Sequence, residues 1–376
     1  MGSKEPPTPI LGSQNTKAAS TRRTAAQIRH PKIGAGGPLF LFPLLLLLML
    51  LAAWVGPAAL SPAEVWAALR HGPNGLETND IILWSQRLPR IVLAALVGGS
   101  LALAGTAFQA LLRNSLADPY IVGVSAGASV GSEAILLASG EAWLGGLALP
   151  LTAFGGATAA MLVVYALARR QGRVPVTTLL LAGVVISSFL GGISTLMLLL
   201  GPPSDTSHIL GRLMGSLQDA DAPLSLHLPG GPACQPFQQC GVLLLFLIGG
   251  SLILLREARA MNLFALGEES AQQLGVETEQ FKAVLIVTGS LLTAASVAFA
   301  GMIGFVGLMS PHIARRLART PDHRAVLPLS VLTGALLMVG ADTLARIILR
   351  DGRELPVGVV TAFLGAPFFC YLLRRL

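Results

Sequence analysis

Long apolar runs separated by short polar stretches recur along most of the chain. Each run is continuous and does not alternate, which favours membrane-spanning helices over the strands of a membrane β-barrel. Run lengths and the flanking Pro, Gly and charged residues predict ten membrane segments: 38–57, 88–111, 119–138, 143–168, 176–200, 240–255, 281–301, 305–317, 325–348 and 356–373. The eighth is short for a span. We expect an all-α polytopic membrane protein, with residues 38–376 forming one membrane domain.

The composition agrees with a membrane-embedded helix bundle. Of the 376 residues, 53% are hydrophobic and only 12% are charged, which is too little charge to cover a water-soluble protein of this length. Glycine is abundant, with 42 residues, and small residues let membrane helices approach closely. Gly123, Gly127 and Gly131 recur at every fourth position, so they predict a small-residue face on the third segment.

The distribution of basic residues predicts how the chain lies in the membrane. Residues 1–37 form a polar, basic stretch that is typical of a disordered tail. The positive-inside rule places this tail in the cytoplasm, and the predicted loops on the same side carry most of the later arginines. The net charge of +7 is explained by this topology and does not indicate nucleic-acid binding.

Five arginines depart from the rule because they fall on the predicted outer side: Arg87, Arg90, Arg346, Arg350 and Arg353. A basic residue on that side carries an insertion cost, so its presence needs an explanation. One explanation is recognition of carboxylates on a partner, which the guanidinium fork pairs with well. For Arg346, the alternatives are an ion pair with Asp342, four residues earlier on the same helix, and snorkelling to the interface.

Motifs for catalysis and nucleotide binding are absent from the sequence. No GxxxxGK(S/T) run is present, so the chain has no P-loop for ATP. Neither an HExxH nor a GxSxG motif occurs, and no cluster of His, Cys and Asp indicates an enzyme or a metal site. We expect a non-catalytic membrane subunit that binds no cofactor itself. If transport uses ATP, another subunit must bind ATP and Mg²⁺.

The cysteines and one histidine carry weak signals. Cys370 lies in an apolar run and is expected to behave as a small hydrophobic side chain. Cys234 and Cys240 flank a predicted outer loop, where a disulfide is one interpretation, and without nearby histidines they indicate no metal. His312, next to Pro311, has no other potential metal or proton-transfer residue near it in the sequence, which favours a structural role.

Glu133 is a carboxylate inside a predicted membrane segment. An acid at membrane depth is a functional candidate by default, because burying it is costly. Two interpretations stay open. Glu133 lines a translocation pathway, or it has a structural explanation, which is either a position near the end of its helix or pairing with another group.

The stretch 113–131, "RNSLADPYIVGVSAGASVG", interrupts the apolar pattern. Asn114 and Asp118 favour turns and helix caps, because their side chains hydrogen-bond to nearby backbone. Pro119 suits the first turn of a following helix. The stretch therefore predicts a tight cytoplasmic turn between two helices.

Several ordered motifs resemble the permease family that imports iron–siderophore chelates, haem and vitamin B12, the FecCD type of ABC importer subunit. In the first half these are "RLPR" (87–90), "GGSLALAGTAFQALLRNSLADPYIVGVSAGASVG" (98–131) and "LLLAGVVISS" (179–188). In the second half they are "RLMGSL" (212–217), "MNLFALGEESAQQLGV" (261–276), "AGMIGFVGLMSPHIARRL" (300–317), "PDHRAVLPLS" (321–330), "GADTLAR" (340–346) and "ELPVGVVTAFLGAPFF" (354–369). Residues 222–239 depart from the family pattern, so we expect the sixth segment to be shortened or displaced.

The resemblance implies a dimeric bundle with about ten transmembrane helices per protomer and a central translocation pathway. Its implied partners are a second permease protomer in a homodimer, two cytoplasmic ATPase subunits that carry ATP and Mg²⁺, and an extracytoplasmic substrate-binding protein. The implied location is the bacterial cytoplasmic (inner) membrane. Ferric siderophore is the expected cargo, with vitamin B12 and haem as alternatives.

The resemblance also implies roles for particular residues. Arginines that match Arg87, Arg90 and Arg346 dock the binding protein in this family. The stretch 258–276 resembles the coupling helices that sit in a cleft of each ATPase subunit. Its candidate contact residues are Asn262, Leu263, Leu266, Gly267, Glu268 and Glu269. A plain solvated linker helix is the alternative interpretation of this stretch.

The cytoplasmic gate of the family lies at a turn and at a helix start. The matching residues here are Asn114, Leu116, Val176 and Thr177. Short side chains at such a gate would let small helix shifts open it.

Two other classes of protein stay open. An ion-coupled secondary transporter would need buried acids as coupling-ion sites, and Glu133 and Asp342 are the candidates in this sequence. A membrane enzyme is disfavoured by the lack of a catalytic constellation.

Overall fold

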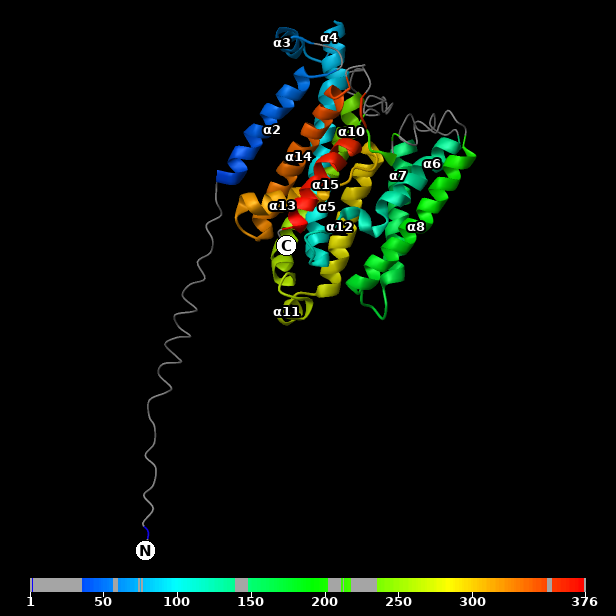
Figure 1. Cartoon of the computed structure of the whole chain (residues 1–376), viewed down its shortest axis with the longest axis vertical. Coiled ribbons are helices and arrows are strands. Elements are labelled where there is room, and N and C mark those ends of the chain that lie inside the picture. The colour runs from blue at the N-terminus through cyan, green and yellow to red at the C-terminus, as the bar shows by residue number, and fades with distance from the viewer. Residues whose placement is uncertain are drawn as a thin grey trace.

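The computed structural model describes Gly2 and residues 36–56, 60–73, 75, 77–138, 148–201, 211, 213–217, 235–349 and 354–374. Within these ranges the chain is helical, and no β-strand occurs (Figure 1). One isolated bridge joins Arg170 and Arg173. The predicted tail, apart from Gly2 and its last two residues, lies outside the described residues, as do Arg350, Arg353 and Cys234.

The helices follow one another in this order: α2 (Gly36–Trp54), α3 (Pro62–His71), α4 (Thr78–Ile81), the π-helical η1 (Ile82–Arg87), α5 (Leu88–Leu112), the 3₁₀ turn η2 (Pro119–Val122), α6 (Val124–Leu137), α7 (Ala148–Ala168), α8 (Val176–Leu200), α10 (Gln235–Phe264), α11 (Glu268–Gln273), α12 (Thr278–Ala300), α13 (Val306–Ala318), α14 (His323–Ile347) and α15 (Val357–Leu373). A helix overlaps each of the ten predicted segments. Six of the described helices are long and apolar enough to cross a membrane. Ten crossings stay a prediction.

The prediction that the sixth segment is shortened was wrong. Helix α10 has 30 residues, so it is neither shortened nor limited to 240–255. It begins inside the stretch that departs from the family pattern and continues past Arg256 and Arg259. Charged residues ended the apolar run in the sequence, but a helix satisfies its own backbone hydrogen bonds and can continue beyond the apolar layer.

Helix α5 is the centre of the bundle. In the most apolar 18-residue stretch of the span that contains α5, 83% of the residues are buried. In the corresponding stretch of α8, only 11% are buried. Two glycines of α5 lie against backbone: Gly98 faces Gly334 of α14, and Gly105 faces Gly307 of α13, with no room for a Cβ. Gly127 of α6 meets Gly156 of α7 in the same way. These contacts confirm that small residues set the helix spacing.

The bundle has two distinct ends (Figure 1). Helices α3 and α4 lie at one end, which we call the α3–α4 end. Helix α11 lies at the opposite end, which we call the α11 end, together with the loop between α7 and α8. Cys240, on α10, carries a free and buried thiol that lies 3.5 Å from the carbonyl oxygen of Pro89, while the free thiol of Cys370 is exposed.

Candidate functional site

Three of the predicted site arginines meet in one buried cluster at the α3–α4 end. Arg90 of α5 places Nε 3.0 Å and Nη2 2.9 Å from Oδ1 of Asp342 on α14. Its Nη1 donates to Oε2 of Glu354 at 2.6 Å. Arg346 completes the cluster, with Nε 3.1 Å from Oδ2 of Asp342. We call Arg87, Arg90, Asp342, Arg346 and Glu354 the arginine cluster.

Two members of the arginine cluster cap the end of α2. Arg87 donates to the carbonyl oxygens of Ala53 and Trp54 at 2.9 and 3.0 Å. Arg346 donates to those of Ala52 and Val55 at 3.3 and 3.2 Å. The last carbonyls of a helix lack partners within the helix and carry partial negative charge, so a guanidinium satisfies them well. These arginines therefore hold α2 against α5 and α14.

This placement gives the arginines a role inside the chain. All three side chains are buried, and each contacts carbonyls or carboxylates of the same chain. The i, i+4 pair between Asp342 and Arg346 was the alternative weighed from the sequence, and the structure shows it. Direct docking of a binding protein by Arg87, Arg90 and Arg346 stays a prediction.

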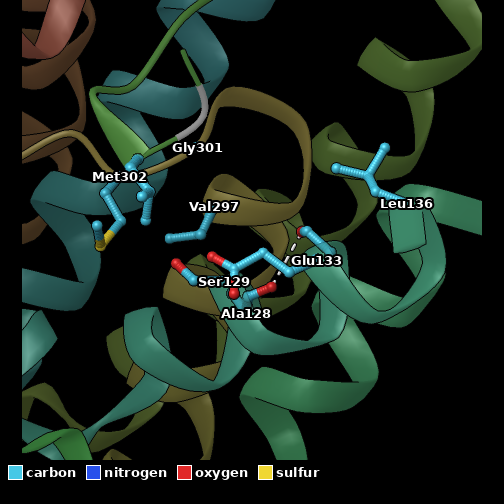
Figure 2. Close-up of a pocket in the computed structure, with 9 residues that line it drawn as sticks. Ala128, Ser129, Glu133, Leu136, Val297, Gly301 and Met302 are labelled. Atoms are coloured by element: carbon cyan, nitrogen blue, oxygen red, sulfur yellow. Dashed lines mark hydrogen bonds between the residues drawn. The ribbon is translucent and has the colours of Figure 1, made fainter. Parts of the chain in front are cut away.

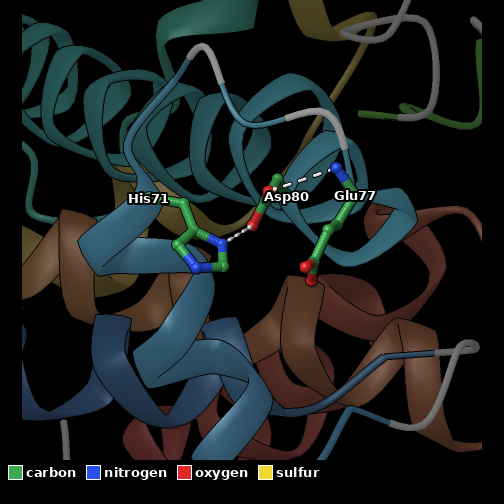
Figure 3. Close-up of side chains that lie close together, drawn as sticks. All are labelled: His71, Glu77 and Asp80. Atoms are coloured by element: carbon green, nitrogen blue, oxygen red, sulfur yellow. Dashed lines mark hydrogen bonds and ion pairs between the residues drawn. The ribbon is translucent and has the colours of Figure 1, made fainter.

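A small polar group lies at the same end, where α3 leads into α4 (Figure 3). Potential metal ligands of His71, Glu77 and Asp80 lie within 4.8 Å of one another. The two carboxylate oxygens of Asp80 are already engaged, one 3.2 Å from Nδ1 of His71 and the other accepting from the backbone N–H of Glu77 at 3.3 Å. The second contact belongs to a capping box at the start of α4, so the arrangement is explained as a turn.

The predicted coupling segment forms a distinct projection at the α11 end. Helix α10 ends at Phe264, and the six-residue helix α11 follows Gly267. Gly267 has φ 126° and ψ 150°, a backbone conformation that residues other than glycine rarely adopt. Leu266 is 68% exposed, and Glu269 is exposed as well. An apolar and an acidic side chain are thus open to a partner.

Asn262 is turned the other way, into the protein. Its Nδ2 donates to Oδ1 of Asp322 at 2.7 Å, and its Oδ1 accepts from the backbone N–H of His323 at 3.0 Å. Partial burial favours the neutral form of Asp322, but hydrogen bonds from Asn262 and from the backbone of Arg324 outweigh it and hold the pKa of Asp322 below its usual value. Asn262 therefore fastens the end of α10 to the turn between α13 and α14.

A cleft at the α11 end brings together motifs that are far apart in the sequence. It encloses about 600 Å³ and is lined by the α5–α6 turn, the α10–α11 connection and the α13–α14 turn. Asn114, Asn262 and Leu266 all line it. One residue predicted for gating therefore lies beside two residues predicted for coupling, while Leu116, Val176 and Thr177 do not line this cleft.

The α5–α6 turn has the predicted geometry. Oδ1 of Asn114 accepts from the N–H of Leu116 at 2.9 Å, and Oδ1 of Asp118 accepts from that of Tyr120 at 2.8 Å. Helix α8 packs against this connection, since Gly183 faces the carbonyl oxygen of Ile121 with no room for a Cβ. Helix α8 thus contacts this connection at Gly183, while at the start of α8 Val176 is half-buried and Thr177 is exposed.

Lys282 of α12 is a buried cation that the sequence analysis did not single out. Its ammonium Nζ lies 2.8 Å from Oε1 of Glu268, 2.5 Å from Oε1 of Glu279 and 3.0 Å from the carbonyl oxygen of Val174. Oε2 of Glu279 accepts from the N–H of Val174 at 2.8 Å. We call Val174, Glu268, Glu279 and Lys282 the lysine cluster. A lysine in the first turns of an apolar helix, three residues after a glutamate, was the signal that could have revealed it.

Glu133 lies in α6 and is almost fully buried (Figure 2). Its Oε1 accepts from the hydroxyl of Ser194 on α8 at 2.5 Å. Its Oε2 has no hydrogen-bond partner among the described residues, and Glu133 lines a small cavity with Ser129, Val297 and Met302. The carboxylate therefore joins α6 to α8 and faces a cavity.

Comparison with known proteins settles the family. The sequence profile of the FecCD transport family matches residues 44–375, nearly the whole predicted membrane domain. The chain belongs to the FecCD transport family. Members of this family are the transmembrane permease subunits of ABC transporters, so this FecCD chain is an ABC importer permease and a multi-pass inner-membrane protein. Permeases of this kind work with ATPase and substrate-binding partners.

Individual relatives agree with the family. The chain is 43% identical over 303 residues to the cobalamin import system permease protein BtuC of Halobacterium salinarum, covering 79% of this chain and 74% of the relative. It is 37% identical to the vitamin B12 import system permease protein BtuC of Citrobacter koseri, covering 88% and 92%. A solved structure of an inward-facing metal-chelate type ABC transporter aligns with a TM-score of 0.75 at 26% identity, covering 90% of this chain and 99% of that one.

Proposed function

We propose that this chain forms the membrane pathway of an ATP-driven importer for vitamin B12 or a closely related corrinoid. The observation that carries the proposal is the identity of 43% and 37% to two permeases named for cobalamin or vitamin B12 import. A ferric siderophore or another iron chelate is the second candidate, because the similar solved structure is described as a metal-chelate type transporter.

We place the ATPase partners at the α11 end, which is then the cytoplasmic side. Leu266 and Glu269 are exposed there, and the cleft beside them is lined by three connections that the sequence predicts to be cytoplasmic. A small exposed helix beside a cleft suits insertion into a partner. ATP and Mg²⁺ would be bound by the ATPase subunits, and this chain would carry out no covalent chemistry.

We propose that a second copy of the chain completes the pathway, with α8 beside it. Only 11% of the residues in the most apolar 18-residue stretch of α8 are buried within one chain. Its exposed apolar side chains include Leu181, Val185 and Phe189, which suits contact with a second copy or with lipid. Glu133 of α6 accepts a hydrogen bond from Ser194 of α8. It is our candidate polar group near this pathway.

The substrate-binding protein would dock at the opposite, α3–α4 end. Arg87, Arg90 and Arg346 support the surface there by holding α2, α5 and α14 together. Replacing them would disturb the fold as well as any docking. Their direct contact with the partner is therefore best tested by crosslinking in the assembled complex.

The test is reconstitution of the chain in proteoliposomes with the ATPase and binding protein of the same genome. We expect ATP-dependent accumulation of cyanocobalamin, and no accumulation when the ATPase cannot hydrolyse ATP. Accumulation of a ferric siderophore alone would replace the corrinoid proposal with the second candidate. Transport that survives loss of the ATPase and collapses with the proton gradient would contradict the proposed function.

A further inference from the structure

The lysine cluster joins three segments that are separate in the sequence. Glu268 belongs to α11, Glu279 and Lys282 belong to the first two turns of α12, and Val174 lies in the loop that leads into α8. Lys282 reaches the other two segments directly, at 2.8 Å to Glu268 and 3.0 Å to Val174. The helix proposed to contact the ATPase and the helix proposed to form the gate are thus linked by one side chain.

The chemistry of Lys282 indicates that it links three segments and does not only fill space between them. Its side chain is 2% exposed, and a buried ammonium is costly unless its donors are satisfied. An ammonium has three N–H donors, and three acceptors surround this one. An apolar side chain would fill the same space more easily, so the charge serves to hold the three acceptors together.

Val174 is held at both of its backbone polar atoms. Its carbonyl accepts from Lys282, and its N–H donates to Glu279, which is itself paired with Lys282. Pro175 follows at the N-cap of α8, and its ring restricts rotation of the backbone. A shift of Val174 would therefore move the first turn of α8, which contains Val176 and Thr177, and would not be lost in a flexible loop.

The two glutamates differ from Lys282 in their exposure. Glu268 is 39% exposed and Glu279 is 34% exposed, so both carboxylates can exchange their bond to Lys282 for water. Helix α11 has only six residues and begins at a glycine in an unusual conformation. Ala271 is the one residue of this helix that is buried, so few contacts hold the helix in place and it can move relative to α12 when a partner pulls on it.

We propose that Lys282 is a positioning residue that transmits movement of α11 to the start of α8. This inference rests on the proposed function, in which α11 contacts the ATPase. When the ATPase displaces α11, Glu268 moves relative to Lys282, and the change reaches Val174 through the same ammonium. Loss of the ammonium separates ATP binding from movement of the gate.

The experiment follows a probe at the gate. Cys234, Cys240 and Cys370 are replaced by alanine, and Thr177→Cys, an exposed position, is labelled with a fluorophore in the complex with the ATPase. Addition of ATP and vanadate is expected to change its fluorescence in this background. In the Lys282→Met variant we expect the change to fall about tenfold, while the ATPase still co-purifies and hydrolyses ATP.

Two further variants separate the charge from the packing. Lys282→Arg keeps the charge, so it is expected to recover much of the response. Gln280→Met, on the same helix but exposed, is expected to respond as the background does. A Lys282→Met complex that responds as strongly as the background would overturn the inference.

Glu268→Gln covers the case in which Lys282→Met does not yield a folded complex. It weakens only the link from α11 and leaves the pair of Lys282 and Glu279 in place. We expect a reduced response in Glu268→Gln alone. Where Lys282→Met does yield a folded complex, adding it to Glu268→Gln is expected to cause no further loss, because both changes break one link. A full response in Glu268→Gln, or an additive loss in the double variant, would contradict the proposal.

The outcomes also separate the inference from the function on which it rests. If the background complex does not assemble with the ATPase and shows no response to nucleotide, the proposed function fails. If the background assembles and responds, and the variants respond equally, only the role of Lys282 fails.

Discussion

The arginine cluster and the lysine cluster lie at opposite ends of the bundle, and they stabilise buried basic side chains in different ways. In the arginine cluster, Asp342 is 1% exposed and lies between two buried guanidiniums. In the lysine cluster, a buried ammonium meets two carboxylates that are each about one third exposed, Glu268 at 39% and Glu279 at 34%. One cluster is closed to water, and the other is open on its acidic side.

The difference lies also in the elements that carry the charges. Asp342 and Arg90 belong to helices of 25 residues that pack tightly, so their relative positions are fixed. Glu268 belongs to a helix of six residues. Buried charges between long helices brace the fold, whereas part-exposed charges on a short helix can separate and re-form. The contrast teaches that a buried basic residue is best interpreted from the mobility of its partners.

The largest expected effect tests the closed cluster. Asp342→Ala leaves Arg90 and Arg346 buried without their shared carboxylate, which should lower the free energy of unfolding by about 3–5 kcal/mol. Denaturation of the detergent-purified chain measures this loss. The control is Glu277→Gln, which neutralises an exposed acid that makes no capping hydrogen bond. A loss no larger than that of the control would mean that the arginine cluster does not brace the fold.

The second effect tests the open cluster by the same measurement. Lys282→Met removes the ammonium, but Glu268 and Glu279 regain water because they are part-exposed. We expect the free energy of unfolding to fall by about 1–3 kcal/mol, less than for Asp342→Ala. Equal losses in the two variants would remove the distinction between the clusters.

The third effect compares strained glycines at the two ends. Gly267→Ala places a Cβ at φ 126°, next to α11, and Gly72→Ala does so at φ 77°, after α3. Each should cost about 1–3 kcal/mol of local strain. Only Gly267→Ala should weaken co-purification with the ATPase, because only it distorts the start of α11. Equal yields of the complex from both variants would argue against a coupling role for α11.

The smallest effect concerns a buried acid without a cation. Ser194→Ala removes the hydroxyl that donates to Glu133, and hydrogen bonds of this kind between membrane helices contribute about 0.6–2 kcal/mol. The adjacent Thr195→Ala is the control, because its hydroxyl bonds within its own helix to Gly191. Thermal unfolding of both variants checks the difference. A larger loss of stability for Ser194→Ala than for Asp342→Ala would show that charge pairing does not determine which variant is destabilised most.

Local chemistry determined much of the fold. The apolar runs placed a helix in each of the ten predicted segments, because membrane helices need continuous apolar sequence. The turn at Asn114 and Asp118 was also predicted correctly, since side-chain caps act over a few residues. The length of α10 was not, because charged residues do not end a helix that extends beyond the apolar layer.

The sequence by itself determined the membrane class, the helix positions and, through its motifs, the permease family. Only the tertiary structure decided what the buried charges do. Arg90 meets Asp342 across 252 positions, and Lys282 meets Val174 across 108. Such partners are chosen by how helices pack, and packing depends on contacts between distant segments that no local pattern in one sequence records. For that reason two of the arginines predicted to face a partner, Arg87 and Arg346, were found to hold α2 in place. The lysine that joins α11 to the loop before α8 likewise emerged only from the fold.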